Sequence, residues 1–217
     1  MKRKNRLKIL VTAGPTREPI DPVRFISNYS TGLLGYEVAR EAKKRGHRVI
    51  LISGPSPLAK PKGIPATDVL TAHQMEKELK KKFSWCNCLV MTAAIGDFRA
   101  EKIARTKIKR SKDRLILKLT RNPDILSALG RVKGRRMLVG CALETEGLRA
   151  NAQAKLKTKK LDLIVATQMK ASSYPFGQAR LDALMIDKPG KIRKIGMVTK
   201  RRLAGILLDT VEKTCYT

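Results

Sequence analysis

The chain of 217 residues has a mass of 24.2 kDa, which corresponds to one large domain or two small ones. Its hydrophobic fraction of 42% excludes disorder over the whole chain, and it contains no apolar stretch long enough to span a bilayer. The 47 Lys and Arg residues against 18 Asp and Glu residues give a formal net charge of +29, which attracts anions.

The first half of the chain alternates apolar, β-branched runs with amphipathic segments. The apolar runs predict buried parallel strands over residues 8–13, 48–53 and 87–93. Between these strands we predict helices over residues 31–45 and 72–83. This alternation predicts a mostly parallel sheet with helices on both faces.

Three segments interrupt the alternation. Residues 14–29 contain three prolines and no helical period, so we expect a long loop there. Residues 54–70 form a second proline-rich connection. Residues 100–114 are highly charged and lack glycine, which predicts a mobile basic flap.

The second half continues with strands and helices of the same kind. We predict a short helix opened by Asn122 and Pro123 and a hairpin around residues 188–190. The other predicted elements are strands over 114–120, 136–143 and 161–167, and helices over 145–159 and 200–213. We therefore predict one α/β domain over residues 1–217, with a Rossmann-like three-layer fold.

The four cysteines do not indicate a disulfide framework in a chain of this length. Cys86 and Cys88 are too close for a usual zinc pair, and Cys141 and Cys215 stand alone. We expect reduced thiols that are buried or half-buried. We also expect a cytoplasmic protein, because the apolar run after the basic N-terminal residues is too short for a secretory signal.

Small polar residues precede the first predicted helix, at residues 27–35 (SNYSTGLLG). The free backbone N–H groups at such a helix start, with the positive end of the helix dipole, attract a phosphate or a carboxylate. Ser30 or Thr31 acting as an ordinary helix cap explains the same pattern. The spacing differs from G-x-G-x-x-G, so the signal for NAD is weak.

Residues 92–97 (TAAIGD) follow a predicted strand at its carboxyl end, where ligands bind in open α/β sheets. Asp97 is a candidate to hold Mg²⁺ bound to a triphosphate, and its alternative role is a turn cap. Lys107, Lys109 and Arg110 lie in the predicted flap. They either close over phosphates or form a solvated charge run.

Two further sites carry polar residues at helical positions. Asn122 and Asp124 flank Pro123 at a predicted helix start, which indicates either a phosphate cradle or simple capping. Lys155 and Lys159 share one helix face, and they either bind an anion or belong to a solvated basic face. Without a catalytic triad, an HExxH motif or a P-loop in the sequence, these sites favour a transferase or ligase that uses a nucleotide.

Several segments resemble phosphopantothenoylcysteine synthetase, the C-terminal half of the bifunctional coenzyme A biosynthetic flavoprotein. The longest is VTAGPTREPIDPVRFISNYSTG at residues 11–32. The others are AAIGDF at 93–98, KIK at 107–109, NPDI at 122–125, GCALETE at 140–146, NAQAK at 151–155 and LDLIVA at 161–166. They occur in the family's order and cover nearly the whole chain.

The resemblance implies a phosphopantothenate–cysteine ligase that uses CTP, or ATP in some relatives, together with Mg²⁺. The carboxylate of 4′-phosphopantothenate attacks the α-phosphate of the nucleotide, pyrophosphate leaves, and an acyl-cytidylate forms. The amine of L-cysteine then displaces CMP and gives 4′-phosphopantothenoyl-L-cysteine. The resemblance also implies a homodimer with a small β extension, in which the flap of one subunit reaches the other's site.

The resemblance further implies roles for individual residues. Asn28 handles the acyl-cytidylate, Lys107 serves the cysteine step and contacts the nucleotide, and Arg24 and Ala94 lie near the phosphopantothenate. Asp97 meets the metal-bound nucleotide. The other nucleotide-binding positions are Met91, Thr92, Ala93, Asn122, Pro123, Asp124, Ile125, Cys141, Lys155 and Lys159.

Some positions depart from the family pattern. Tyr29 and Leu33 stand where many relatives carry basic residues, and Gly96 stands where alanine is usual. Cys141 replaces a common Phe and cannot stack on a base, so the choice between CTP and ATP stays open. Residues 176–182 match the family's Phe-containing loop only loosely. The flavin-dependent decarboxylase half has no counterpart in this sequence, so we expect that activity on a separate chain.

Two alternatives from other classes remain. An NAD(P)-dependent short-chain oxidoreductase fits the Thr31-Gly-x-x-Gly pattern, but the sequence lacks the Tyr-x-x-x-Lys pair of that class. A basic nucleic-acid-binding protein fits the net charge, but the basic residues are dispersed and aromatic residues make up only 4%. We expect neither a membrane nor a specific nucleic acid as a partner.

Overall fold

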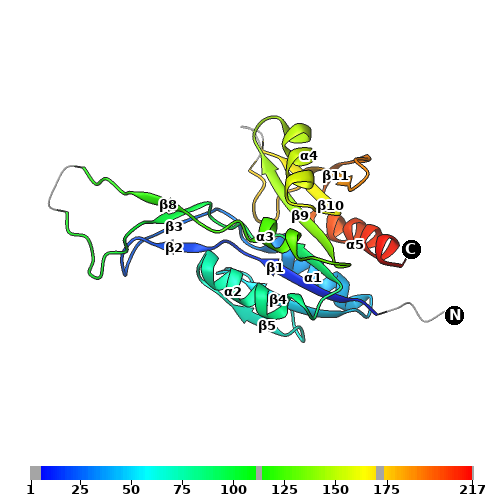
Figure 1. The fold of residues 1–217 in the computed structure, drawn as a ribbon, viewed down its shortest axis with the longest axis horizontal. Coiled ribbons are helices and arrows are strands. Elements are labelled where there is room, and N and C mark those ends of the chain that lie inside the picture. The colour runs from blue at the N-terminus through cyan, green and yellow to red at the C-terminus, as the bar shows by residue number, and fades with distance from the viewer. Residues whose placement is uncertain (1–5, 111–113, 170–173, 217) are drawn as a thin grey trace.

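A mostly parallel β-sheet forms the centre of the structure, a computed structural model that describes residues 6–110, 114–169 and 174–216 (Figure 1). The strands of this sheet are β1 (Lys8–Ala13), β4 (Arg48–Ser53), β5 (Ala66–Asp68), β6 (Cys88–Met91), β9 (Met137–Glu144), β10 (Leu163–Gln168), β11 (Leu181–Asp187) and β12 (Ile192–Val198). Within the described residues their order is β12-β11-β10-β9-β6-β1-β4-β5. The pairs from β10 to β5 are parallel, and β11 and β12 add an antiparallel edge.

The central strand β1 is buried on both faces, which explains its continuous apolar sequence. It pairs with β4 and β6 so that Leu10 lies opposite Ile50 on one side and Leu89 on the other. Successive side chains point to opposite faces, so Ile9 belongs to one hydrophobic core and Leu10 to the other.

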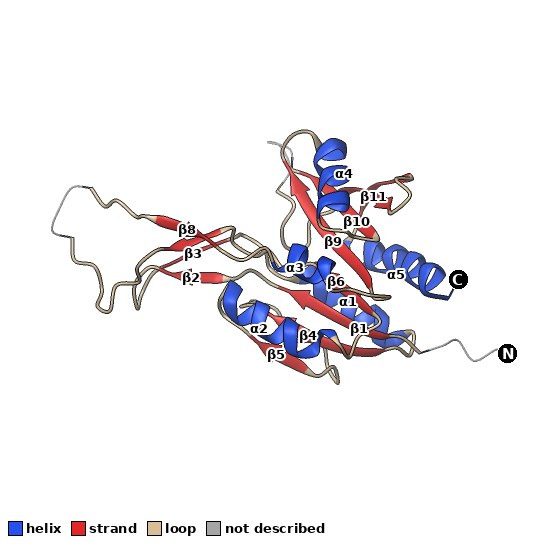
Figure 2. Ribbon diagram, viewed as in Figure 1, coloured by secondary structure: helices blue, strands red, loops and turns tan. Residues whose placement is uncertain are grey.

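Helices cover both faces of the sheet and form three layers with it. The helices α1 (Leu33–Lys44) and α5 (Lys200–Tyr216) pack on one face. The helices α2 (Ala72–Phe83), α3 (Ile125–Arg131) and α4 (Leu148–Thr158) pack on the other. In Figure 2 the helices α2 and α4 lie in front of the strands and α1 lies behind them. The three-layer α/β fold predicted from the sequence is therefore confirmed. No helix within the described residues is both long and apolar enough to cross a membrane.

Two short antiparallel strand pairs form an arm that projects from the sheet (Figure 1). The strands β2 (Arg17–Pro19) and β3 (Phe25–Ser27) form one pair, and β7 (Phe98–Ala100) and β8 (Leu119–Arg121) form the other. β2 lies against β7, so the two pairs form one unit. The guanidinium of Arg17 lies 4.6 Å from the centroid of the Phe25 ring, across the first pair.

The arm and the sheet edge correct three predictions. Residues 14–29 are not a long loop, because β2 and β3 form a hairpin within them. The strand expected over 114–120 is restricted to β8, because only residues 119–121 find a partner strand. The connection over 54–70 contains β5, which pairs with β4. Residues 111–113 of the predicted flap lie outside the described residues.

The start of α1 also differs from the prediction. Neither Ser30 nor Thr31 caps the helix, which begins after Gly32 with no side-chain cap. Gly32 has a φ of +80°, and a Cβ atom added there would lie 2.8 Å from the Gly14 nitrogen. The helix start is therefore set by a close approach of two backbone segments rather than by a hydroxyl cap.

Two later helices begin after the predicted positions. The cap of α3 is Asp124 rather than Asn122, since the Asp124 carboxylate accepts a hydrogen bond from the Ser127 N–H at 3.0 Å. The helix expected over 145–159 starts only after Gly147, which adopts a left-handed conformation. A side-chain cap thus sets the start of α3, and a left-handed glycine sets the start of α4.

The packing of α1 on the sheet can be tested at Gly35. A Cβ atom added there would lie 2.6 Å from the Ala13 Cβ and 2.8 Å from the Thr12 carbonyl oxygen, and it would collide with the Thr92 hydroxyl. We expect Gly35→Ala to lower the free energy of unfolding by about 1–3 kcal/mol, because overpacking pushes the helix away from the sheet. Urea unfolding measures this change.

Gly205→Ala in α5 is the matched control. A Cβ atom at Gly205 meets only the Arg45 guanidinium, at 3.7 Å. Helix propensity then predicts a free energy of unfolding that is unchanged or raised by up to about 1 kcal/mol. Equal effects of the two substitutions would contradict the close packing of α1 against β1.

Candidate functional site

A cleft of about 560 Å³ opens at the carboxyl ends of β6 and β9, bordered by the loop after β6 and by helices α3 and α4. This is the end of an open parallel sheet where ligands bind. The lining includes Ala94 and most positions that the resemblance assigns to the nucleotide, namely Met91, Ala93, Asp97, Asn122, Pro123, Asp124, Ile125, Cys141, Lys155 and Lys159. The structure therefore gathers in one place residues that are far apart in the sequence.

Two ion pairs hold the lysines of α4 at this cleft. The Lys155 ammonium lies 2.5 Å from a carboxylate oxygen of Glu144, at the end of β9. The Lys159 ammonium lies 3.0 Å from the carboxylate of Asp124, at the start of α3. The Asn151 amide donates a hydrogen bond of 3.0 Å to the second Glu144 oxygen. Neither lysine is therefore a freely solvated charge, and a separate carboxylate orients each of them.

Asn122 joins the two loops that border the cleft. Its side-chain amide donates to the Gly96 carbonyl oxygen at 2.8 Å, and its backbone N–H donates to the Asp97 carbonyl oxygen at 2.8 Å. Its side-chain oxygen accepts a hydrogen bond of 3.3 Å from Arg99. The Asn122 side chain therefore holds the turn at residues 96–97 against the start of α3.

The exposed side chain of Asp97 lines the cleft and makes no hydrogen bond or ion pair with another residue that the structure describes. No three His, Cys, Asp or Glu side chains gather as a metal cluster within the same residues. A single carboxylate fits a Mg²⁺ ion that arrives with its nucleotide, because Mg²⁺ combines one or two carboxylates with phosphate oxygens. Asp97 is therefore the residue of this cleft suited to such an ion.

Cys141 provides part of the apolar wall of the cleft, together with Met91 and Leu126. Burial raises the pKa of the Cys141 thiol to about 12, so the thiol stays neutral near pH 7. A thiol that does not ionise is a poor nucleophile. The position therefore contributes apolar surface rather than covalent chemistry.

Asn28 reaches the rim of the cleft from the loop between β3 and α1. Its side-chain amide donates a hydrogen bond of 3.1 Å to the carbonyl oxygen of Ala94. The Thr16 N–H donates to the same oxygen at 3.1 Å, and the Ala94 N–H donates to the Gly14 carbonyl oxygen at 2.9 Å. Asn28 and Ala94, which the resemblance places near the same substrate, are thus in direct contact.

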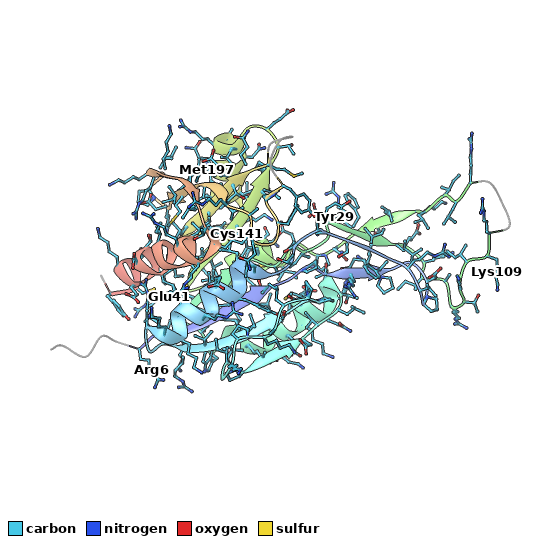
Figure 3. All side chains as sticks on the ribbon, turned by 180° about the vertical axis from the view of Figure 1, so that it is seen from behind. Arg6, Tyr29, Glu41, Lys109, Cys141 and Met197 are labelled. Carbon is cyan, nitrogen blue, oxygen red and sulfur yellow. The ribbon has the colours of Figure 1, made fainter. Side chains whose placement is uncertain are left out.

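Arg24 and Lys107 lie on the arm instead. Arg24 donates to the Asp21 carboxylate at 2.9 Å and to the Ile108 carbonyl oxygen at 2.9 Å. Lys107 is exposed beside this cluster and is not part of the described lining of the cleft. Figure 3 shows Lys109, close to Lys107 in the sequence, far out on the arm and well away from Cys141. The structure therefore does not bring these two predicted residues to the cleft of their own chain.

The structure changes the set of predicted site residues at two positions, Thr92 and Glu144. Thr92 turns away from the cleft, because its hydroxyl donates a hydrogen bond of 2.6 Å to the Thr12 carbonyl oxygen. Glu144 is not among the residues predicted from the sequence, and its carboxylate orients Lys155. The available signal was its place at the end of a predicted strand, eleven residues before a lysine on the following helix.

The family comparison agrees with this geometry. A model of the DNA/pantothenate metabolism flavoprotein C-terminal domain matches residues 4–215. The chain belongs to this family. The resemblance stated from the sequence is therefore confirmed.

Two curated relatives show the extent of the match. The chain is 40% identical over 204 residues to the coenzyme A biosynthesis bifunctional protein CoaBC of Bacillus subtilis (strain 168), covering 94% of this chain and 50% of that protein. It is 37% identical over 209 residues to CoaBC of Escherichia coli (strain K12), covering 94% of this chain and 51% of that protein. The chain thus spans about half the length of these relatives.

Solved structures agree with the fold. The crystal structure of the C-terminal domain of CoaBC superposes with a TM-score of 0.82 at 31% identity, covering 97% of this chain and 96% of that one. A Cab2 structure in complex with phosphopantothenate-cysteine superposes with a TM-score of 0.77 at 17% identity, covering 98% of this chain and 88% of that one. At this low identity the Cab2 structure shows a common fold.

The cluster around Asp21 predicts a pH dependence of stability. The hydrogen bond from Arg24 holds the pKa of the Asp21 carboxyl well below its usual range, with help from backbone N–H groups and against the effect of burial. A lowered pKa in the folded state stabilises the fold above the unfolded value of about 3.9, and this stabilisation is lost as the pH falls toward the folded value.

We therefore expect Asp21→Asn to be less stable than the wild type at about pH 7, with a difference that shrinks below about pH 4. Urea unfolding of both proteins at a series of pH values measures the difference. A difference that stays constant down to about pH 3 would show that the Asp21 carboxylate does not stabilise the fold through its charge.

Proposed function

We propose that this chain is a phosphopantothenate–cysteine ligase of coenzyme A biosynthesis. The observation that carries the proposal is the cleft at the ends of β6 and β9, which gathers Lys155, Lys159 and Asp97 in a chain that is similar to the C-terminal domain of CoaBC. The cleft offers cations and an apolar wall, without an activated nucleophile among its described residues. It therefore suits a reaction that depends on binding and charge neutralisation.

In the proposed first step, a carboxylate oxygen of 4′-phosphopantothenate attacks the α-phosphorus of CTP. The bond between this phosphorus and the bridging oxygen breaks, and pyrophosphate leaves. In the second step the amine of L-cysteine attacks the activated carbonyl carbon and loses a proton. CMP leaves with the original carboxylate oxygen, and 4′-phosphopantothenoyl-L-cysteine remains.

The geometry of the cleft supports a position for the nucleotide. Lys155 and Lys159 lie on one side, where their ammonium groups would neutralise the negative charge of the triphosphate. Asp97 would hold Mg²⁺ bound to the same phosphates, and this ion would stabilise the charge that develops on the leaving pyrophosphate. The wall at Met91 and Cys141 would meet the base. We propose CTP as the nucleotide, with ATP as the alternative.

The contact between Asn28 and Ala94 supports a neighbouring position for the acid substrate. The start of α1 lies immediately along the chain, and its free N–H groups suit the phosphate of 4′-phosphopantothenate. A product of the same kind, phosphopantothenate-cysteine, is bound in the Cab2 structure of this fold. The carboxylate end of the acid would then point toward the nucleotide in the adjoining cleft.

The arm supports a homodimer. Its described segments expose a series of large apolar side chains, namely Val23, Phe25, Phe98, Ile103, Leu115, Ile116, Leu117 and Leu119. A concentration of exposed apolar surface on one projecting element is typical of an interface between proteins. In the proposed dimer this arm packs on a second copy, and Lys107 of one subunit serves the cleft of the other.

Pyrophosphate release tests the proposed function. The purified chain is incubated with Mg²⁺, 4′-phosphopantothenate and each nucleoside triphosphate in turn, with and without L-cysteine. We expect release that requires phosphopantothenate and that turns over continuously only when cysteine is added. The nucleotide that supports release identifies the co-substrate. No release with any triphosphate would contradict the ligase.

Mixing two inactive variants tests whether the flap acts across the dimer. We expect Lys107→Gln to release pyrophosphate without forming product, and Asn28→Asp to accumulate the acyl-cytidylate. If Lys107 of one subunit serves the cleft of the other, a dimer of one subunit of each variant contains one site with both substitutions and one site with neither. Random reassembly of equal amounts would restore about a quarter of the wild-type rate of product formation.

The control for this experiment is each variant alone, unfolded and refolded in the same way. If Lys107 acts in the cleft of its own chain, every site in the mixed dimer carries one substitution. The mixture would then stay as inactive as the separate variants, which would contradict the crossed arrangement.

A further inference from the structure

Lys200 is a buried lysine at the start of α5, and the proposed mechanism does not use it. It is 8% exposed, and its ammonium donates hydrogen bonds to the carbonyl oxygens of Pro175 at 2.8 Å and Ala179 at 2.9 Å. No carboxylate in the described part of the chain forms an ion pair with it. Burial of an ammonium without a carboxylate is unfavourable, and it lowers the pKa of Lys200 to about 8.

Both of these carbonyl groups belong to the loop between β10 and β11. This loop presents the rings of Tyr174 and Phe176, whose centroids lie 4.9 Å apart. The Tyr29 ring lies 6.1 Å from each of them, so the three rings form one cluster. The ammonium of Lys200 therefore fixes the backbone of the segment that carries two of the three rings.

The aromatic cluster borders the site on the side of the acid substrate. Tyr29 directly follows Asn28, which contacts Ala94 at the rim of the cleft. The three rings are not part of the described lining that contains Lys155 and Lys159, on the nucleotide side. Tyr29 and Tyr174 are 77% and 58% exposed, so the cluster offers an exposed aromatic surface next to Asn28 in the chain. Such a surface suits an aliphatic chain better than a triphosphate.

We propose that Lys200 is a positioning residue for the acid substrate, because it holds the loop at residues 174–180 so that Tyr29, Tyr174 and Phe176 cover the aliphatic body of 4′-phosphopantothenate. This inference rests on the proposed function and extends it to a residue outside the cleft. It assigns residues 174–180 to the acid and leaves the nucleotide to the cleft. A loss of Lys200 would therefore weaken binding of one substrate selectively.

Lys200→Met tests this role, because methionine keeps a similar length without the charge or the donors. Arg201→Met is the matched control: it removes one positive charge from the same helical turn, where Arg201 is exposed. Initial rates are measured while phosphopantothenate and the nucleotide are varied separately, and thermal unfolding is recorded for each variant. We expect the KM for phosphopantothenate to rise about tenfold in Lys200→Met, with the KM for the nucleotide within about twofold of the wild type.

A second substitution separates the loop from a general effect on folding. Phe176→Ala should raise the KM for phosphopantothenate. Adding Lys200→Met to this variant should raise that KM little further, since both residues act through the same loop. If Lys200→Met does not fold, Lys200→Arg carries the test. Arg keeps the charge and the donors but shifts the loop through its larger planar head, so the same KM should rise.

The outcomes separate this inference from the ligase itself. If the wild-type chain forms no product, both the ligase function and the role of Lys200 are overturned. A wild-type chain that forms product, with an unchanged KM for phosphopantothenate in the Lys200 variant that folds, overturns only the role of Lys200. Equal rises in the KM for both substrates, or purely additive effects of Lys200→Met and Phe176→Ala, would show a structural anchor and would also overturn it.

Discussion

Backbone segments meet in direct contact at the end of β1, and this contact positions the candidate site. An added Cβ atom at Gly14 would lie 2.8 Å from the Gly54 carbonyl oxygen, and one at Gly32 would lie 2.8 Å from the Gly14 nitrogen. Three segments thus meet without side chains between them. Their approach sets the start of α1 and carries the preceding loop toward the strand ends, where Asn28 contacts Ala94. The two proposed substrate positions adjoin because of this contact.

Charge is organised locally, although the chain as a whole carries +29. In the cleft, Glu144 and Asp124 hold Lys155 and Lys159 at fixed places, which reduces the entropy that these side chains lose when a polyanion binds. The long-range field of the remaining basic residues would speed the arrival of anionic substrates. Two paired lysines therefore supply fixed positive charge at the cleft, and the excess charge of the chain would act at longer range.

The sequence predicted the elements that depend on short-range patterns. The strands at residues 8–13 and 48–53 and the helix at 72–83 coincide with β1, β4 and α2, because hydrophobic period and capping residues are local signals. The arm hairpin and the start of α1 were missed, because they depend on contacts between distant backbones. The sequence motifs identified most residues of the cleft and placed Lys107 in the flap, whereas the pairing of Glu144 with Lys155 requires tertiary structure.

Activation of the acid by transfer of a nucleotidyl group in this cleft can be tested directly with an isotope label. Phosphopantothenate labelled with ¹⁸O in its carboxylate is converted to product with unlabelled triphosphate, and the nucleotide products are analysed by mass spectrometry. Nucleotidyl transfer predicts one ¹⁸O atom in the phosphate of the nucleoside monophosphate. Label in inorganic phosphate with release of a nucleoside diphosphate, or no transfer of label, would contradict it.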